Sequence, residues 1–267
     1  MPLSGMIGIA IVAFWLSMAL VGPYIAPYDV GGVTGDDVFA PMSAHYLLGT
    51  DYLGRDMLSR ILHGAPYTIG VALAAVLIAS STGTALALCA AAVGGWFDAI
   101  VSRIVDIMIT IPSKLLALLM VASFGASVPL LIITAAVSYM PGAYRIARAL
   151  AVNVQAMDYV QAARSRGEGL FYITLFEMLP NMIRPVLADF GLRFLFIVLL
   201  LSGLSFLGLG IQPPEADWGS LVRENIIGLG QGAPALIMPA IAIATLTIGV
   251  NMAIDGLMGR KRRGSEG

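Results

Sequence analysis

The stretch DYVQAARSRGEGLFYITLFEMLP, residues Asp158–Pro180, is a polar island between long apolar segments. Hydrophobic residues make up 58% of the 267-residue chain and charged residues only 12%, against roughly 25% charged residues in soluble domains. This composition indicates a polytopic membrane protein. Since helices satisfy their backbone hydrogen bonds internally in lipid and an open sheet does not, the predicted fold class is all-α.

Six windows are apolar enough to cross a bilayer, which needs roughly 20 residues per helix. The predicted spans are Met6–Ala26, Ile69–Val93, Ile100–Ala122, Val128–Leu150, Val186–Gly210 and Ala233–Leu257. The first window exceeds the apolar region of a cleaved signal peptide, so we expect a retained span. One transmembrane domain, residues 1–267, then carries outside loops at 27–68 and 211–232 and a cytoplasmic loop at 151–184.

Basic residues are unevenly distributed between the two sides of these spans. The outside loops hold only Arg55, Arg60 and Arg223. Nine others belong to the opposite side: Arg145, Arg148, Arg164, Arg166, Arg184, Arg260, Lys261, Arg262 and Arg263. The positive-inside rule therefore predicts that both termini and the Asp158 loop face the cytoplasm. The net charge of −1 argues against a nucleic-acid partner.

The polar island predicts a short helix. Asp158 followed by Gln161 resembles a capping box, in which both side chains bond early backbone N–H groups. Ala162 and Ala163 leave one side of the helix almost without bulk, and Gly167 is expected to end it in the left-handed conformation.

A second, amphipathic helix is expected to follow and to close before Pro180. Its apolar positions recur every three residues, at Leu170, Ile173, Phe176 and Leu179. The two helices would form a small knob. Such a knob either enters a groove on a partner protein or packs on its own chain.

Residues 161–180 resemble the EAA signature of the membrane-spanning subunits of ATP-binding cassette importers, which reads Glu-Ala-Ala, three residues, Gly, nine residues, Ile, one residue, Leu-Pro. The positions in register are Ala162, Ala163, Gly167, Leu179 and Pro180, whereas Gln161 and Glu177 stand in place of Glu and Ile. The resemblance implies that this loop, with Asp158, is the coupling helix that docks into a cleft on an ATPase subunit. An ion pair from position 161 is not available here, because Gln161 carries no carboxylate.

Further segments are similar to the dipeptide, oligopeptide and nickel permease subfamily, of the second-subunit type. They are IAPYD at 25–29, HYLLGTDYLGRDMLSRILHGA at 45–65, GGWFDAIVSRIVDIMITIP at 94–112 and LSFLGLGIQPPEADWGSL at 204–221. On these motifs, which cover nearly the whole length, the chain is identified as a member of that family. The resemblance implies a type I importer transmembrane domain with six transmembrane helices, in a bacterial inner membrane.

The implied function is ATP-driven import of di- and oligopeptides, with nickel, metal chelates (metallophores) or opines as alternative cargo and a secondary transporter as a remote alternative. The implied partners are a related permease subunit, two ATPase subunits or domains that bind Mg-ATP, a solute-binding protein and membrane lipid. We expect no cofactor, metal or catalytic site in this chain, since it has no Walker loop or zinc helix and its only histidines are His45 and His63.

The outside loop carries the signature Gly49, Thr50, Asp51, Gly54, Arg55 and Asp56. Gly49, Gly54 and Gly64 are expected to mark turns, and the two aspartates to accept backbone hydrogen bonds. Arg55 and Arg60 are expected to tie the loop down. The segment is either a folded cap or a contact for the solute-binding protein.

Trp218 in the second outside loop is an interfacial anchor or a contact for the same partner.

Ionisable residues within the bundle are Asp106, Lys114, Asp189, Arg193 and Asp255. Asp189 and Arg193 are four positions apart and predict an ion pair on one helix.

Ser202, Gly203 and Ser205 permit close helix approach or line a path. The sequence assigns no residue to the substrate path.

Overall fold

The computed structural model describes residues 3–33, 37–231 and 233–258. Arg260, Lys261, Arg262 and Arg263, on which part of the predicted topology rests, lie outside these residues. The described α-helices are α1 (Leu3–Ile25), α2 (Met57–Ala65), α3 (Val71–Val93), α4 (Gly95–Ile109), α5 (Ser113–Phe124), α6 (Val128–Gln155), α7 (Asp158–Ser165), α8 (Leu170–Tyr172), α9 (Leu179–Phe206), α10 (Trp218–Glu224) and α11 (Pro234–Met258). Two π-helical segments, Pro66–Gly70 and Ile173–Met178, join α2 to α3 and α8 to α9, and a 3₁₀ segment covers Ile226–Gln231. The predicted all-α class is confirmed.

Among the described residues, five helical runs are long and apolar enough to cross a membrane, and a sixth span exists if α4 and α5 are counted together. The five are Leu3–Ile25, Met57–Val93, Val128–Gln155, Leu170–Phe206 and Pro234–Gly256.

The prediction of one continuous helix over Ile100–Ala122 is wrong, because α4 and α5 meet at a bend of 78°. Pro112 lies at this break with extended backbone (φ −56°, ψ 127°). Proline has no N–H to continue the ladder and disfavours helical geometry in the residue before it.

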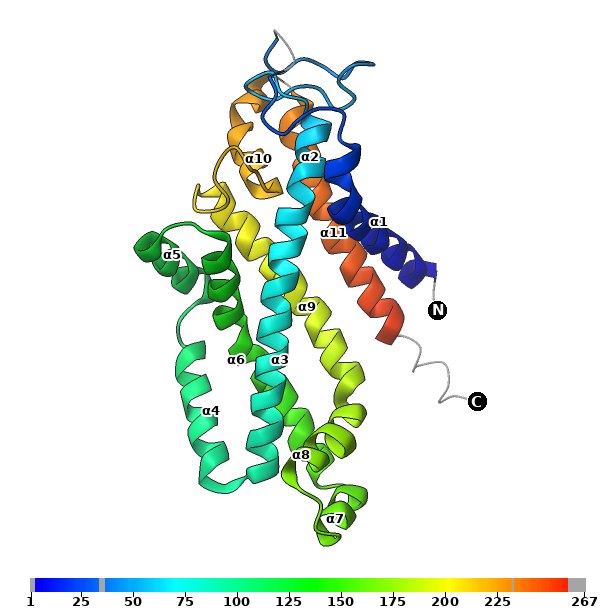
Figure 1. Ribbon diagram of the computed structural model, residues 1–267, viewed down its shortest axis with the longest axis vertical. Helices are drawn as coiled ribbons and strands as arrows, with labels where there is room; N and C mark the ends of the chain where they lie inside the picture. The colour runs from blue at the N-terminus through cyan, green and yellow to red at the C-terminus, as the bar shows by residue number, and fades with distance from the viewer. Residues whose placement is uncertain (1–2, 34–36, 232, 259–267) are drawn as a thin grey trace.

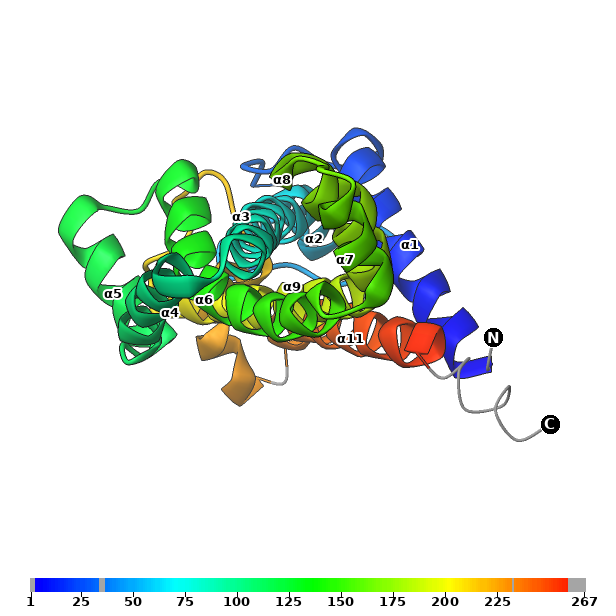
Figure 2. The ribbon, with the colours of Figure 1, turned by 90° about the horizontal axis from the view of Figure 1, so that it is seen from below.

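Three long helices, α3, α6 and α9, form the centre of the bundle (Figure 1). Helices α4 and α5 lie on one flank and α1 and α11 on the other, as the view from below also shows (Figure 2). Helices α7 and α8 lie at one end of the molecule. The cap, which we define as residues 37–56 with α2 and α10, lies at the opposite end (Figure 1).

Small residues allow the helices to approach closely, as is common in membrane bundles. A Cβ atom on Gly5 of α1 would lie 2.6 Å from the Cα of Gly256 of α11. A Cβ on Gly83 of α3 would lie 2.9 Å from the carbonyl oxygen of Met140 of α6. Larger side chains at these two crossings would force the helices apart.

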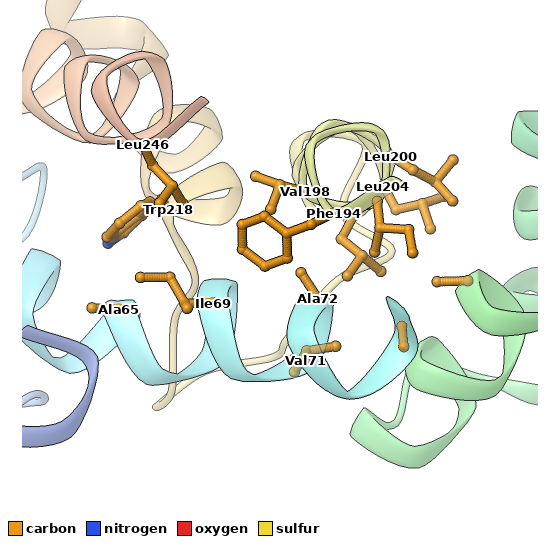
Figure 3. Packing of buried hydrophobic residues seen from close by; sticks show 14 of the residues in the cluster. Ala65, Ile69, Val71, Ala72, Phe194, Val198, Leu200, Leu204, Trp218 and Leu246 are labelled. Atoms are coloured by element: carbon orange, nitrogen blue, oxygen red, sulfur yellow. The ribbon is translucent and has the colours of Figure 1, made fainter. Parts of the chain in front are cut away.

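The upper core joins the cap to the bundle. Phe194 and Val198 of α9 extend into the same core as Ala72 of α3, while Trp218 of α10 lies between Leu246 of α11 and the α2–α3 run (Figure 3). The cap is therefore packed on the same core as the spans.

Candidate functional site

Helix α7 is a short knob at the free end of the bundle, and a defined helix stop terminates it. Gly167 has φ +81°, and its N–H donates to the carbonyl of Arg164 at 2.9 Å. The N–H of Glu168 donates to the carbonyl of Ala163 at 3.2 Å. This pair of bonds is a Schellman motif, which needs a left-handed residue at the position of Gly167. The prediction that Gly167 ends this helix in the left-handed conformation is confirmed.

The predicted capping box at the start of α7 is wrong. Met157 is the N-cap residue, and no side chain bonds the first turn. Gln161 instead donates from Nε2 to the carbonyl of Gln155 at 2.9 Å. Asp158 is the first helical residue, where its negative charge favours the positive end of the helix dipole.

The two faces of α7 have different roles. Val160 and Ala163 are fully buried against the bundle. The opposite face, formed by Asp158, Tyr159, Gln161 and Ala162, is exposed. The knob thus packs on its own chain with one face and leaves a smooth polar face free.

An arginine side chain ties α7 to the bundle. Arg164 donates from Nη2 to the carbonyl of Ala92, near the end of α3, at 2.8 Å. This bond joins the knob to a central helix across 72 positions of sequence. A displacement of α7 would therefore act on α3 as well as on the segment that follows it.

The prediction that a separate helix closes before Pro180 is wrong. One helical run of 37 residues extends from Leu170 to Phe206. Pro180 occupies the first turn of α9, after the π-helical segment Ile173–Met178, and Leu179 packs against the buried cluster of this end. Within a continuous run, the N–H that a proline lacks removes one bond of the helix. The π-turns just before Pro180, where the N–H of Leu179 donates to the carbonyl of Thr174, shift the bonding register around it.

At the opposite end, Asp51 is the centre of a buried ionic network. Its Oδ1 accepts from the backbone N–H groups of Leu53 (2.8 Å) and Arg55 (2.9 Å). Its Oδ2 accepts from Arg55 Nε (2.7 Å) and Arg60 Nη1 (2.8 Å). Glu224 of α10 accepts from the same two arginines at 3.3 and 2.7 Å. The prediction that the arginines tie the loop down is confirmed.

Glu224 was not predicted, because 164 positions separate it from Arg60 and no sequence signal links them. The side chains of Asp51 and Arg60 are 0% and 1% exposed. The two carboxylates thereby neutralise two guanidinium groups that water does not reach, and they fasten α10 to the 37–56 loop.

The remaining signature residues build turns. Gly49 and Gly54 have φ +76° and +75°, as expected for turn glycines. Thr50 pairs with Asp56 in an isolated bridge, and Asp56 Oδ2 caps α2 by accepting from the N–H of Ser59 at 2.8 Å. These contacts fit the prediction of a folded cap and leave its contact with a solute-binding protein a prediction.

Trp218 is wholly buried, so the prediction that it contacts a partner or anchors at the membrane interface is wrong. Its Nε1 donates to the carbonyl of Ile61 at 3.0 Å, and its ring meets that of Trp15 edge-on at 4.7 Å between centroids. Gly64 marks no turn, contrary to prediction. It lies within α2, where a Cβ would come within 3.2 Å of the Trp218 ring.

Within the bundle, the predicted pair of Asp189 and Arg193 is confirmed. The carboxylate accepts from Arg193 Nε and Nη2 at 2.5 and 3.0 Å. Arg193 also donates from Nη1 to the carbonyl of Tyr139 on α6 at 3.1 Å, and its guanidinium lies against Gly142. The pair therefore joins α9 to α6.

A second bidentate pair was not predicted. Arg148 of α6 donates from Nε and Nη2 to Asp98 of α4 at 2.6 and 2.5 Å. Asp106, Lys114 and Asp255 are exposed and form no ion pair with other described residues.

Ser202, Gly203 and Ser205 of α9 differ in how closely they pack against other helices. A Cβ on Gly219 would lie 2.5 Å from the carbonyl oxygen of Ser202, so α9 and α10 do approach closely there. Ser205 is buried. No atom lies within 4 Å of a Cβ built on Gly203, which does not mediate a close contact within this chain.

A cavity of about 570 Å³ lies beside the α4–α5 bend, between α5, α6 and α9. Its lining includes Ser113, Ser138, Tyr139, Arg145 and Arg193. A second cavity of about 340 Å³ borders the same arginine, Arg145, together with Asp106 and Arg148. Among the described residues, two arginines and three hydroxyl side chains thus line a mainly apolar cavity beside the break between α4 and α5.

Comparison with known proteins identifies relatives over most of the chain. Residues 82–263 match the family described as binding-protein-dependent transport system inner membrane component. The chain is 33% identical over 261 residues to the di/tripeptide transport system permease protein DppC of Pseudomonas aeruginosa, covering 96% of this chain and 85% of that protein. It is 32% identical over 248 residues to the glutathione transport system permease protein GsiD of Pectobacterium atrosepticum, covering 92% and 80%.

Among solved structures, the chain is similar to one titled as the crystal structure of an amino acid ABC transporter with histidines. The TM-score is 0.51, with 18% identity over 76% of this chain and 93% of that chain. At this identity the likeness establishes a shared fold.

Proposed function

This chain belongs to the family of binding-protein-dependent transport system inner membrane components, and we propose that it serves an importer of di- and oligopeptides. It is a multi-pass permease subunit with the fold of an ABC importer transmembrane domain. The proposal extends this assignment to the cargo, the partners and the way the subunit works.

One observation carries the peptide proposal. Relatives that align with 92–96% of this chain at 32–33% identity are named for di/tripeptide, dipeptide or glutathione transport. All three names refer to short peptides, counting glutathione as a tripeptide. Nickel, metal chelates and opines are the alternative cargoes, since the path residues alone do not fix specificity.

We propose that α7 is the coupling helix and docks on an ATPase subunit through its exposed face. Asp158, Gln161 and Ala162 lie on that face, while Ala163 is buried and Gly167 ends the helix. Gln161 cannot make an ion pair, and its side-chain amide already bonds within the chain. Mg-ATP is bound and hydrolysed by two partner subunits or domains, and this chain supplies no catalytic group.

The orientation follows from the same assignment. Helix α1 begins, and α11 ends, away from the cap (Figure 1), which suits termini on the cytoplasmic side with α7. The cap then faces the solute-binding protein. A related permease subunit and lipid would cover exposed apolar side chains of α4 and α5 such as Ile107 and Leu119, which are 60% and 65% exposed.

The proposal is tested by purifying the subunit from its native host in mild detergent and identifying the chains that copurify by mass spectrometry. The recovered complex is reconstituted with its binding protein, and uptake of labelled dipeptide, Ni²⁺ and a nickel chelate is measured with and without ATP. ATP-dependent dipeptide uptake supports the proposal. Uptake of nickel or a chelate alone would replace the cargo, and uptake driven by an ion gradient without ATP would refute the importer mechanism.

A further inference from the structure

Arg145 is a charged residue in the span formed by α6. It lies in α6, and its side chain is exposed. It forms no hydrogen bond or ion pair with any other residue that the structure describes. Its neighbours Arg148 and Arg193 are each held by a carboxylate. Since an unpaired charge within a span is costly to maintain, Arg145 is a candidate for a functional role.

Arg145 lies on an exposed side of α6, beside two cavities. It precedes the end of α6 at Gln155 by ten residues, which is about 15 Å at 1.5 Å rise per residue. It borders both cavities, of about 570 and 340 Å³, and the larger is within the range of roughly 300–1,000 Å³ typical of ligand pockets.

The groups around Arg145 leave its positive charge available. The larger cavity is lined mainly by apolar side chains, with the hydroxyl groups of Ser113, Ser138 and Tyr139 and with no acidic side chain among the described residues. The cation of Arg193 at its wall is already neutralised by Asp189. In the smaller cavity the only carboxylate among the described lining residues is Asp106, which forms no ion pair with Arg145.

We propose that Arg145 binds the C-terminal carboxylate of a peptide as the peptide passes through this cavity. A guanidinium presents paired N–H donors that match a carboxylate bidentately, and such charge-assisted bonds are stronger than neutral ones. Every transported peptide with a free C-terminus carries this group, whatever its side chains. The site would therefore recognise peptides as a class. This inference rests on the proposed peptide cargo.

The test compares two cargoes in the complete importer, reconstituted in proteoliposomes with its binding protein. ATP-dependent uptake is measured for trialanine and for its C-terminal amide, each at a concentration that saturates the binding protein. The subunit is wild type, Arg145→Gln, Arg145→Lys or Arg103→Gln. Arg103 is a matched control, because it is an exposed arginine of the neighbouring α4 that lines neither cavity.

The measured quantity is the ratio of acid to amide uptake. The preference of the binding protein is the same for every variant and cancels when ratios are compared. We expect Arg145→Gln to lower the ratio about tenfold, as for loss of a charge-assisted bond. Arg145→Lys should retain part of the preference and Arg103→Gln all of it. Amide uptake by Arg145→Gln shows that this variant is folded.

An unchanged ratio in Arg145→Gln would overturn the proposal. Equal loss of acid and amide uptake, with loss of the second permease from the purified complex, would instead assign Arg145 to a carboxylate of that partner. Equal loss with an intact complex would assign it to a lipid headgroup or a structural role. If wild type transports neither peptide but another cargo, the peptide function fails, and this inference fails with it.

Discussion

Replacing Asp51 with asparagine should loosen the cap without changing its shape. Asparagine is isosteric and still accepts from the N–H groups of Leu53 and Arg55 through Oδ1. Its amide nitrogen, however, would face Arg55 Nε and Arg60 Nη1, which now donate to Oδ2 at 2.7 and 2.8 Å. Glu224 would remain the sole carboxylate for two buried guanidinium groups.

The size of the effect follows from burial. Arg60 is 1% exposed, and its Nε and Nη2 already lack partners among the described residues. Removing one partner of a buried ion pair costs about 3–5 kcal/mol. Because Glu224 still contacts both arginines, we expect the lower end, about 3 kcal/mol.

The assay is hydrogen–deuterium exchange of peptides covering residues 49–60 in the purified importer. Since 1.4 kcal/mol corresponds to a tenfold change in an equilibrium constant, about 3 kcal/mol predicts exchange roughly a hundredfold faster. Asp29→Asn is the matched control, because Asp29 lies in the same outside loop and is exposed. Exchange in Asp51→Asn that matches wild type would show that other contacts hold the cap.

Three further predictions concern the coupling end, the bundle and α10. Gly167→Val should reduce ATP-dependent uptake several-fold while the amount of inserted subunit is unchanged, because valine at φ +81° costs about 1–2 kcal/mol. Gly169→Val, at φ −71° in open space, should transport normally, and equal loss in both variants would count against the helix stop. Asp189→Asn should lower the melting temperature of the purified importer, because Arg193 is 7% exposed and loses its counter-charge; an unchanged melting temperature would contradict this. Burial raises the pKa of the Asp217 carboxyl, so the folded state holds this proton more tightly than the unfolded chain. The Asp217 carboxyl therefore stabilises the folded state most at low pH. This stabilisation is lost as pH rises from about 3.9, the usual pKa of aspartate, through the raised pKa of the folded state. Protection of residues 218–224, measured as exchange relative to the intrinsic rate at each pH, should fall over that range in wild type and not in Asp217→Asn.

The sequence alone predicted those structural features that depend on a single residue, on close neighbours or on composition. Five spans followed from apolar length, and the end of α7 followed from Gly167, since glycine is the residue that takes a left-handed conformation at little cost. The pair of Asp189 and Arg193 followed from helical spacing. Each of these depends on neighbours within a few positions, which a single sequence displays.

Features that depend on distant contacts were not visible in the sequence. Trp218 lies in a segment with the composition of a surface loop. Its ring is nevertheless buried, and it contacts Trp15 of α1 and Ile61 of α2, each more than 150 positions earlier. Glu224 is one acidic residue among many until Arg55 and Arg60 are brought beside it. The bend at Pro112 could have been predicted, because a proline in the middle of an apolar window is a signal in its own right.

The error at Pro180 bears most directly on function. Proline was expected to close a separate helix, and such a break would leave the knob on a flexible joint. The structure instead continues from Leu170 to Phe206 in one 37-residue run, about 55 Å long at 1.5 Å per residue. The π-helical segment Ile173–Met178 shifts the hydrogen-bonding register before the proline, so the helix does not need to end there. Residues 166–169 join α7 to this run, so a displacement of α7 that moves Leu170 would reach Asp189 and Arg193, beside the cavity, along one helix. A continuous helix transmits a displacement that a jointed one would absorb, and the shifted register of the π-helical segment is what lets the run continue past Pro180.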